Sequence, residues 1–251
     1  MRKTSCPYEI LLWINIEDAT FLEFLLDQQL ADVPIRVLGI TPGNIGMQGY
    51  KPLFDAARFG IIAQLDDDVI RISTGIGEMA TDIFTRRPEV KQLVADTWQD
   101  KWTNGARYPL RDYQLYNADD GLYEGKIDGW CSLYHRSVLP VLLTLPYAKY
   151  QTIGAYAHYV IDKQGSKSLL CTRMRVLHLS GPYYASLFDR VEAEKAKFSP
   201  EVHAPMIALF EQVQAAPPPR EVLALALQVA IDGIDAFVPG VTPLQADQPL
   251  H

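Results

Sequence analysis

The sequence predicts an α/β fold with a mostly parallel sheet flanked by helices, followed by a helical C-terminal extension. Short apolar segments with β-branched residues, typical of buried strands, lie at residues 9–16, 35–40 and 61–65. Helical patterns separate these segments, and strand–helix alternation is characteristic of parallel sheets. Three adjacent aspartates follow the third segment directly. Ligands of open α/β sheets bind beyond the carboxyl ends of the strands, so this position is a candidate site.

The two helices between these strands have different signals. In the first, Thr20 and Glu23 fit a capping box. One apolar face then follows at helical spacing, formed by Leu22, Leu25, Leu26 and Leu30. The second helix is short, comes after a glycine-rich turn, and is expected to pass through Leu53, Ala56 and Ala57.

The middle of the chain is less regular. Pro88 is expected to open a helix. Its inner face would consist of Val90, Leu93, Val94, Thr97 and Trp98. Residues 102–128 are rich in Tyr, Asn, Asp and Gly, which predicts loops with short strands.

Helices are expected again at residues 137–145 and 153–164. Gly165 stands where the end of a helix favours a left-handed residue. Residues 169–179 predict either a strand pair or one long strand.

The remaining residues predict a helical region in two parts. A helical pattern begins at Pro182, a stiff proline-rich linker occupies residues 215–219, and a final helix covers residues 220–237. We therefore divide the chain into an α/β domain at residues 1–200 and a helical extension at residues 201–251. The final helix is apolar nearly all round, so it must be buried, either on its own domain or in a homo-oligomer contact. It lacks the basic face that favours attachment to a membrane.

Composition excludes several classes of function. The 251 residues carry a net charge of −7, which disfavours binding to nucleic acid. No segment approaches the roughly 20 apolar residues of a membrane span. The three cysteines, Cys6, Cys131 and Cys171, are far apart and form no CxxC pair, which indicates reduced thiols rather than a zinc site or disulfides. We expect a cytoplasmic protein.

The aspartate triplet predicts a metal site. Adjacent carboxylates repel one another and resist desolvation, and a hard cation such as Mg²⁺ or Mn²⁺ relieves that repulsion. Side chains alternate along an extended chain, so Asp66 and Asp68 would point the same way and Asp67 elsewhere. An ordinary acidic turn after a strand is the alternative.

The segment GIIAQLDDDV resembles the DxD region of GT-A glycosyltransferases, most closely the family-two type. Upstream, Asn44 and Gly46 are similar to the family's Asn-x-Gly segment, and Lys51 stands where the family often has an Arg near the nucleotide diphosphate. Downstream, GKIDGWCSLYHRSVL resembles the acceptor-side segment, and VLHL resembles the late strand whose His completes the metal site. The resemblance covers roughly residues 8–182.

This resemblance implies a GT-A fold and a metal-dependent glycosyltransferase of the hexosyltransferase class. It assigns the metal to Asp66, Asp68 and His178, and the imidazole favours Mn²⁺ over Mg²⁺. It places the donor nucleotide against Asn15, Glu17, Asn44, Lys51, Asp66 and Asp67. The donor would be a nucleotide sugar, with UDP favoured over GDP because UDP is commoner in the family. The acceptor would be a saccharide or another hydroxyl compound.

The catalytic base is the main departure from the family. The family supplies an acidic pair before its late helix, whereas the corresponding stretch PYAKYQTIGAYAHY has no Asp or Glu. We select Asp128 as the base because it adjoins the Gly of the acceptor-side segment. The other candidates are Glu124, the Asp119–Asp120 pair and His158. Inverting and retaining chemistry both stay open.

Two alternative functions stay open. One is a catalytically degenerate, transferase-like subunit that binds a partner, which the missing acidic pair favours and the intact triplet disfavours. The other is a sugar-phosphate nucleotidyltransferase. Such enzymes have a Gly-rich, Arg-bearing loop after the first strand, and this chain has NIEDATFLEF there instead.

Overall fold

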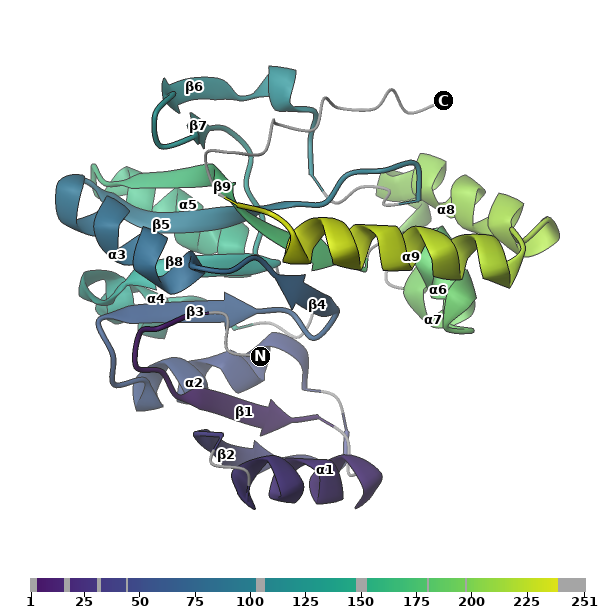
Figure 1. The fold of residues 1–251 in the computed structure, drawn as a ribbon, viewed down its shortest axis with the longest axis horizontal. Helices are drawn as coiled ribbons and strands as arrows, with labels where there is room; N and C mark the ends of the chain where they lie inside the picture. Colours follow the sequence, from purple (N-terminus) through teal and green to yellow (C-terminus); the bar gives the residue numbers. More distant parts are fainter. Residues whose placement is uncertain are drawn as a thin grey trace.

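The computed structural model describes residues 4–15, 19–30, 33–43, 45–102, 107–147, 153–179, 181–196 and 198–238. Its N-terminal part alternates strands and helices as predicted. In chain order the elements are β1 (Ile10–Ile14), α1 (Ala19–Leu30), β2 (Ile35–Ile40), the 3₁₀ turn η1 (Gly46–Gly49), α2 (Tyr50–Ala56) and β3 (Ile61–Leu65). β1 and β2 pair in parallel as a separate two-stranded sheet, which α1 flanks at one end of the molecule (Figure 1).

Helix α1 differs from the prediction in two details. Thr20 lies inside the helix, which begins at Ala19, so Thr20 is not the N-cap of a capping box. Within the predicted apolar face, Leu25 is buried but Leu26 is exposed. The sheet beneath α1 has only two strands, so it covers a narrower strip of the helix than the sequence pattern suggests.

The central sheet contains seven strands in the order β3-β8-β5-β9-β7-β6, with β4 paired to β9. The six strands besides β3 are β4 (Val69–Ile72), β5 (Val90–Thr97), β6 (Gln114–Asn117), β7 (Leu122–Glu124), β8 (Cys131–His135) and β9 (Lys167–His178). β8 runs antiparallel to both β3 and β5, and β9 is parallel to β5, so β3, β5 and β9 share one direction. Their carboxyl ends therefore meet at one edge.

The prediction of a helix after Pro88 is wrong, because this segment forms strand β5. It lies between β8 and β9, and almost all its residues are buried. A strand covered on both faces has apolar residues without strict alternation, so its pattern imitates a helical face. The neighbouring helix is α3 (Ile76–Arg86), which precedes Pro88 and packs on the sheet through Ala80, Ile83 and Phe84.

The later predictions are confirmed. The helix expected at residues 137–145 is the 3₁₀ turn η3 (Arg136–Val138) followed by α4 (Leu139–Thr144), and the next is α5 (Ile153–Lys163). Gly165 has a φ of +78°, as expected for the end of α5. The segment predicted at residues 169–179 is one long strand, β9, which ends at His178, rather than a pair. A 3₁₀ turn, η2 (Leu110–Asp112), and the β6–β7 hairpin occupy the region predicted as loops with short strands.

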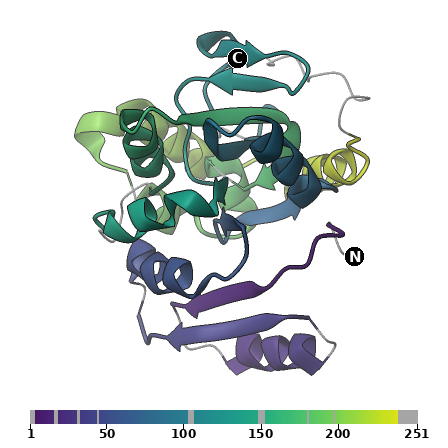
Figure 2. The same ribbon diagram turned by 90° about the vertical axis from the view of Figure 1, so that its left-hand side faces the viewer.

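Helices cover both faces of the central sheet. In Figure 1, α3 lies in front of the sheet and α5 behind it, and Figure 2 shows the same layers from the side. The apolar residues of α3 join one large cluster with β5, β8 and β9. A second cluster joins α2, α4 and α5 to Ile62 and Tyr134 of the sheet. The sheet flanked by helices that the sequence predicts is thus present.

The C-terminal region is helical, as predicted, and it returns to the sheet. Its helices are α6 (Pro182–Leu187), α7 (Val191–Lys195), α8 (Pro200–Ala215) and α9 (Arg220–Asp235). In α9, Ala230 and Ile234 are fully buried against Leu177 of β9. Intramolecular packing therefore accounts for this face of α9, whereas a homo-oligomer contact stays a prediction. Among the described helices, none is long and apolar enough to cross a membrane. The three cysteines are free thiols.

The packing of α9 depends on a glycine. A Cβ atom at Gly233 would lie 2.4 Å from the Trp98 ring, so only glycine permits this approach. We expect Gly233→Ala to lower the free energy of unfolding by about 1–3 kcal/mol, because the helix must shift off the sheet. Chemical denaturation measures this change. Alanine favours helices over glycine by about 1 kcal/mol, so a stabilised variant would contradict the packing described here.

Gly60→Ala is the matched control for this substitution. A Cβ at Gly60 would meet nothing within 4 Å, and its backbone does not need a positive φ. The control variant should therefore unfold within about 0.5 kcal/mol of the unchanged protein.

Candidate functional site

A tight turn connects β3 to β4 and carries the three aspartates. The Asp66 amide donates to the Trp130 carbonyl at 3.1 Å, and the Val69 amide donates to the Asp66 carbonyl at 3.1 Å. Asp67 is exposed at the turn, while Asp66 and Asp68 are half-buried. The turn therefore separates Asp67 from the other two side chains, as the alternation along an extended chain predicts.

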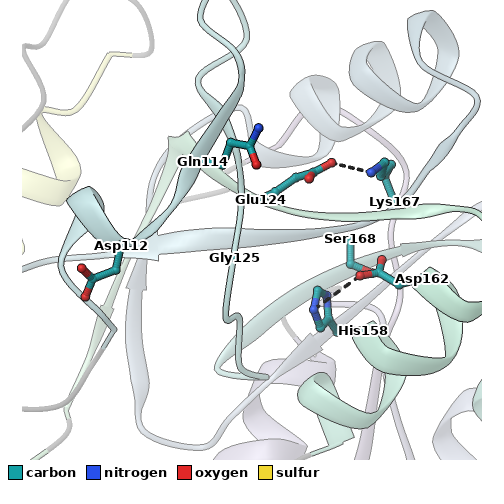
Figure 3. A pocket seen from close by; sticks show the side chains of 8 residues that line it. All are labelled: Asp112, Gln114, Glu124, Gly125, His158, Asp162, Lys167 and Ser168. Atoms are coloured by element: carbon teal, nitrogen blue, oxygen red, sulfur yellow. Dashed lines mark ion pairs between the residues drawn. The ribbon is translucent and has the colours of Figure 1, made fainter.

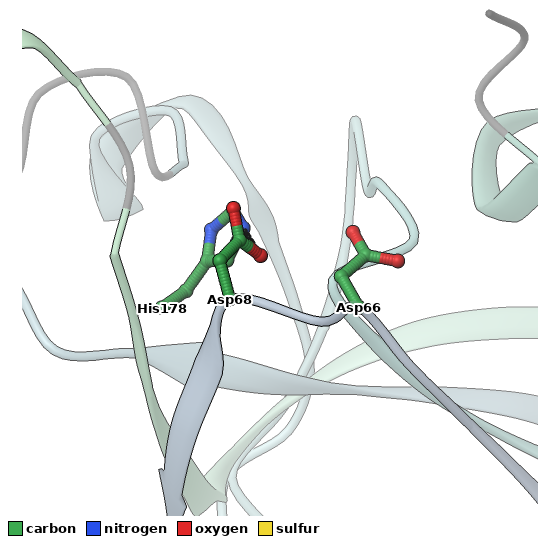
Figure 4. Close-up of side chains that lie close together, drawn as sticks. All are labelled: Asp66, Asp68 and His178. Carbon is green, nitrogen blue, oxygen red and sulfur yellow. Dashed lines mark ion pairs between the residues drawn. The ribbon is translucent and has the colours of Figure 1, made fainter. Parts of the chain in front are cut away.

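The pairing of β4 with β9 brings His178 to the turn. These strands are antiparallel, with Val69 opposite His178, and the Leu179 amide donates to the Asp68 carbonyl at 3.0 Å. The His178 Nε2 atom lies 2.8 Å from Asp68 Oδ1. One ligand atom from each of Asp66, Asp68 and His178 lies within 4.8 Å of the others, and Figure 4 shows these three side chains together.

Two aromatic side chains hold this cluster in place. The Tyr50 hydroxyl donates its one proton towards two acceptors that share it, Asp66 Oδ1 at 3.3 Å and the Leu65 carbonyl oxygen at 3.1 Å. The Trp130 ring stacks on the His178 ring, with 6.4 Å between centroids, and its indole N–H donates to the Ala95 carbonyl at 2.6 Å. Both aromatic residues come from neighbouring elements, so the cluster is anchored from two sides.

The cluster has an excess of negative charge. Burial, together with the charges of Asp68 and Asp128, raises the pKa of Asp66 to about 6, although His178 opposes this shift. Burial disfavours the charged form of His178, but its contact with Asp68 and the nearby carboxylates outweigh that effect and raise its pKa. One imidazolium does not balance three carboxylates. A bound cation would relieve the remaining repulsion.

The cluster opens into a small pocket of about 90 Å³. Asp128 contributes to the same wall, and its Oδ1 accepts from the Gly129 amide at 2.7 Å. Gln64 is held by a hydrogen bond to the Gly129 carbonyl at 3.2 Å. The pocket is lined by Met47, Gln64, Asp66, Asp128, Gly129, Trp130, Ile153 and His178. Asp128, predicted as the base, thus lies beside the predicted metal ligands.

The donor set fits a divalent cation. Two carboxylates and one imidazole are ligands that Mn²⁺ and Mg²⁺ accept. Adjacent ligands of an octahedral ion, each at roughly 2.0–2.1 Å, lie about 2.9 Å apart, which matches the 2.8 Å between His178 Nε2 and Asp68 Oδ1. His178 Nδ1 is buried without a hydrogen-bond partner among the described residues. Among the described residues, the imidazole is therefore oriented by its contact with Asp68 through Nε2 and by stacking against Trp130, and not by a hydrogen bond to Nδ1.

The residues predicted to bind the nucleotide have different surroundings. Asn15 Oδ1 accepts from the Ile45 amide at 3.3 Å, which ties the end of β1 to the segment before η1. Lys51 is exposed on α2, one residue after Tyr50. Glu17 and Asn44 lie outside the described residues. The role of all these residues in nucleotide binding stays a prediction.

The other candidate bases have partners away from the metal cluster. Asp120 is almost fully buried, with Arg86 Nη2 and Arg87 Nε each at 2.7 Å from its carboxylate. Glu124 pairs with Lys167 at 2.6 Å, and His158 faces Asp162 at 3.5 Å. Of the candidates named from the sequence, Asp128 alone lines the pocket that contains Asp66 and His178.

Sequence reasoning missed Tyr50 and Gln64. Tyr50 acts through a contact between α2 and the end of β3, which residue spacing does not encode. Gln64 gave a usable signal, because a polar residue inside the apolar strand IIAQL must find hydrogen-bond partners when buried. Its Oε1 accepts from the Tyr134 hydroxyl at 3.0 Å.

Two solved structures are similar to this chain. One is GalNAc-T7 with UDP, GalNAc and Mn²⁺, which matches with a TM-score of 0.50 and 15% identity over 68% of this chain and 37% of that chain. Another is the mannosyltransferase PcManGT from Pyrobaculum calidifontis in complex with GDP-Man and Mn²⁺, with a TM-score of 0.47 and 12% identity over 89% of this chain and 70% of that chain. No protein-family model and no curated protein matches the chain.

The likeness to GalNAc-T7 establishes the fold. The chain has the GT-A fold of glycosyltransferases, as its resemblance to that family implied. It spans about 37% of the length of GalNAc-T7.

The surroundings of Asp120 predict an acid-sensitive contribution to stability. Hydrogen bonds from Arg86, followed by those from Arg87, lower the pKa of Asp120 from 3.8 to about 2. This contribution is complete above pH 4 or so and is lost as the pH falls towards 2. We expect Asp120→Asn to cost about 1–2 kcal/mol at pH 7, after allowing for solvent around the arginines, and almost nothing near pH 2. Urea unfolding across this pH range measures the difference.

Asp119→Asn is the matched control, because it removes the same charge from an exposed neighbouring side chain. It should leave the pH dependence almost unchanged. Equal effects of the two substitutions at pH 7 would show that the buried ion pairs of Asp120 contribute nothing specific.

Proposed function

We propose that this protein is a metal-dependent glycosyltransferase that moves a sugar from a nucleoside diphosphate sugar to a hydroxyl acceptor. One observation carries the proposal: Asp66, Asp68 and His178 converge at the carboxyl ends of β3 and β9 of a GT-A fold, beside the carboxylate of Asp128. Open α/β sheets bind their ligands at this edge.

Asp66, Asp68 and His178 would hold the cation, and the imidazole favours Mn²⁺ over Mg²⁺. When bound, the cation would supply positive charge to the diphosphate of the donor and to the departing nucleotide. Tyr50 would orient Asp66, and Trp130 would orient His178, through the contacts described above. A site of this kind needs its ligands held rigidly, because small displacements of reacting groups reduce rates strongly.

The donor nucleotide would lie against Asn15, Glu17, Asn44, Lys51, Asp66 and Asp67. A UDP-sugar is favoured over a GDP-sugar, in line with the UDP in the GalNAc-T7 structure. Lys51 would add positive charge near the diphosphate. Arg58, the next basic residue along the chain, is less suitable because its guanidinium binds Glu9 at 2.6 Å.

Asp128 would act as the general base. Its carboxylate would take the proton of the acceptor hydroxyl while the acceptor oxygen attacks the anomeric carbon. The bond from that carbon to the diphosphate breaks, and its electron pair leaves with the nucleoside diphosphate. The half-buried position of Asp128 beside Asp66 and His178 supports an active transferase over a degenerate binding subunit. The saccharide acceptor is proposed from the family resemblance.

Metal-dependent nucleotide binding tests the donor site. We expect UDP with Mn²⁺ to raise the melting temperature, and UDP alone to do so much less. A ligand at 100 times its Kd stabilises by about 2.7 kcal/mol, which is easily measured. Asp68→Asn and His178→Gln should each abolish most of the Mn²⁺-dependent shift, whereas Asp27→Asn, an exposed control on α1, should retain it. A shift that is the same with and without Mn²⁺ would sink the proposed metal site.

Turnover tests the role of Asp128. We expect Asp128→Asn to lower kcat for nucleotide-sugar hydrolysis, with water as the acceptor, by about 10²–10⁴-fold. The melting-temperature shift with UDP and Mn²⁺ should persist, because Asp128 is not assigned to the donor. Asp119→Asn serves as the control and should keep full activity. Unchanged kcat in Asp128→Asn would assign the base to another residue.

A further inference from the structure

A second pocket, of about 350 Å³, lies between β7, α5 and the start of β9 (Figure 3). We call it the β7–α5 pocket; its lining includes Gln114, Glu124, His158, Asp162, Lys167 and Ser168. We propose that this pocket binds one sugar unit of a saccharide acceptor, at a distance from the hydroxyl that reacts. The acceptor role rests on the proposed glycosyltransferase function.

The β7–α5 pocket lies close to the proposed base along the chain and in space. Gly125 lines the pocket, and Asp128 follows three residues later, so their Cα atoms are at most about 11 Å apart. Helix α5 makes a second connection. Its Gly154 lies against the Gly129 backbone, where a Cβ would come within 2.3 Å of the Gly129 Cα. His158 follows Gly154 one turn later, about 6 Å along the helix axis. Gly125 and His158 thus form the wall of the pocket nearer to Asp128, at a separation that a short oligosaccharide can span. Lys167 and Ser168 form the opposite wall at the start of β9, whose other end carries His178.

Two polar atoms at the β7–α5 pocket lack a hydrogen-bond partner in the part of the chain that the structure describes. Ser168 is 2% exposed, and its Oγ has no hydrogen-bond partner among the described residues. His158 Nδ1 also has no hydrogen-bond partner among the described residues. The other ring nitrogen of His158, Nε2, lies 3.5 Å from Asp162 Oδ2. A buried hydroxyl without a hydrogen bond costs free energy, which a ligand that reaches it would recover. These atoms point to a polar occupant.

The charges of the pocket exclude other ligand classes. Lys167 is already paired with Glu124 at 2.6 Å, and further carboxylates line the wall, so a phosphate would be repelled. No three potential ligand atoms converge on a metal position here among the described residues. The side chains of the lining are polar, which disfavours an apolar ligand.

A saccharide unit fits the groups that remain. Sugar hydroxyls donate and accept hydrogen bonds at once, so they can pair with the hydroxyl of serine and with the ring nitrogens of histidine. The wall offers donors from Lys167 and Gln114 and acceptors from Glu124 and Asp162. The volume also lies within the range of small-molecule sites, roughly 300–1,000 Å³.

Isothermal titration of the full chain with maltotriose, cellotriose and N-acetylchitotriose tests the proposal. We expect at least one of these probes to bind. Ser168→Ala should weaken that binding by about threefold to tenfold, the effect of losing one hydrogen bond. The melting temperature of the free Ser168→Ala variant should not fall, because the hydroxyl has no protein partner to lose. Asp162→Asn should weaken binding as well, whereas Asp189→Asn, an exposed control near the start of α9, should not.

Two outcomes would overturn the saccharide pocket: no probe binds at millimolar concentration, or both pocket variants bind as tightly as the unchanged protein. Binding of UDP with Mn²⁺, measured on the same samples, separates this result from the donor site. If UDP with Mn²⁺ binds and the saccharides do not, the pocket proposal alone fails. If the saccharides bind and UDP with Mn²⁺ does not, the acceptor role fails together with the proposed function.

Discussion

Repulsion among carboxylates at the end of β3 is the constraint on which the candidate site depends. Asp66 and Asp68 occupy one turn, and Asp128 lines the same small pocket as Asp66. Burial raises the cost of this arrangement, and the elevated pKa of Asp66 is its direct sign. His178 offsets part of the charge through its 2.8 Å contact with Asp68. The residual negative charge would favour a bound cation and, under the proposed function, a diphosphate held through that cation.

The scaffold maintains this charge cluster through close contacts between separate elements. Pairing of β4 with β9 sets Asp68 beside His178. Gly129 and Gly154 let α5 approach the segment that carries Asp128, since neither position has space for a Cβ. The same approach aligns His158 with the neighbouring β7–α5 pocket. One helix, α5, thus contacts the segment that carries the proposed base and also lines the proposed saccharide pocket.

Local sequence pattern predicted most elements because their signals are local. β1, β2, β3, α5 and α9 have a clear period, a consistent length or a glycine end signal. The prediction for β5 was wrong because this strand lies inside the sheet, between β8 and β9, and is buried on both faces. Such burial removes the alternation of apolar and polar residues that distinguishes a strand. The capping box at Thr20 failed because Ser/Thr-x-x-Glu spacing also occurs inside a helix, and the backbone decides which case applies.

The sequence by itself determined the fold class and the identity of the charged groups, because an apolar strand that ends in three aspartates is a local and costly feature. The sequence also identified Asp128 as a candidate base and His178 as a candidate metal ligand. Only the tertiary structure decided which candidate residues lie close together. Asp128 lines a pocket with Asp66 and His178, whereas Asp120 forms ion pairs with Arg86 and Arg87. Strand pairing and helix packing set these distances. Contacts between residues far apart in the sequence produce no periodic pattern from which they could be predicted.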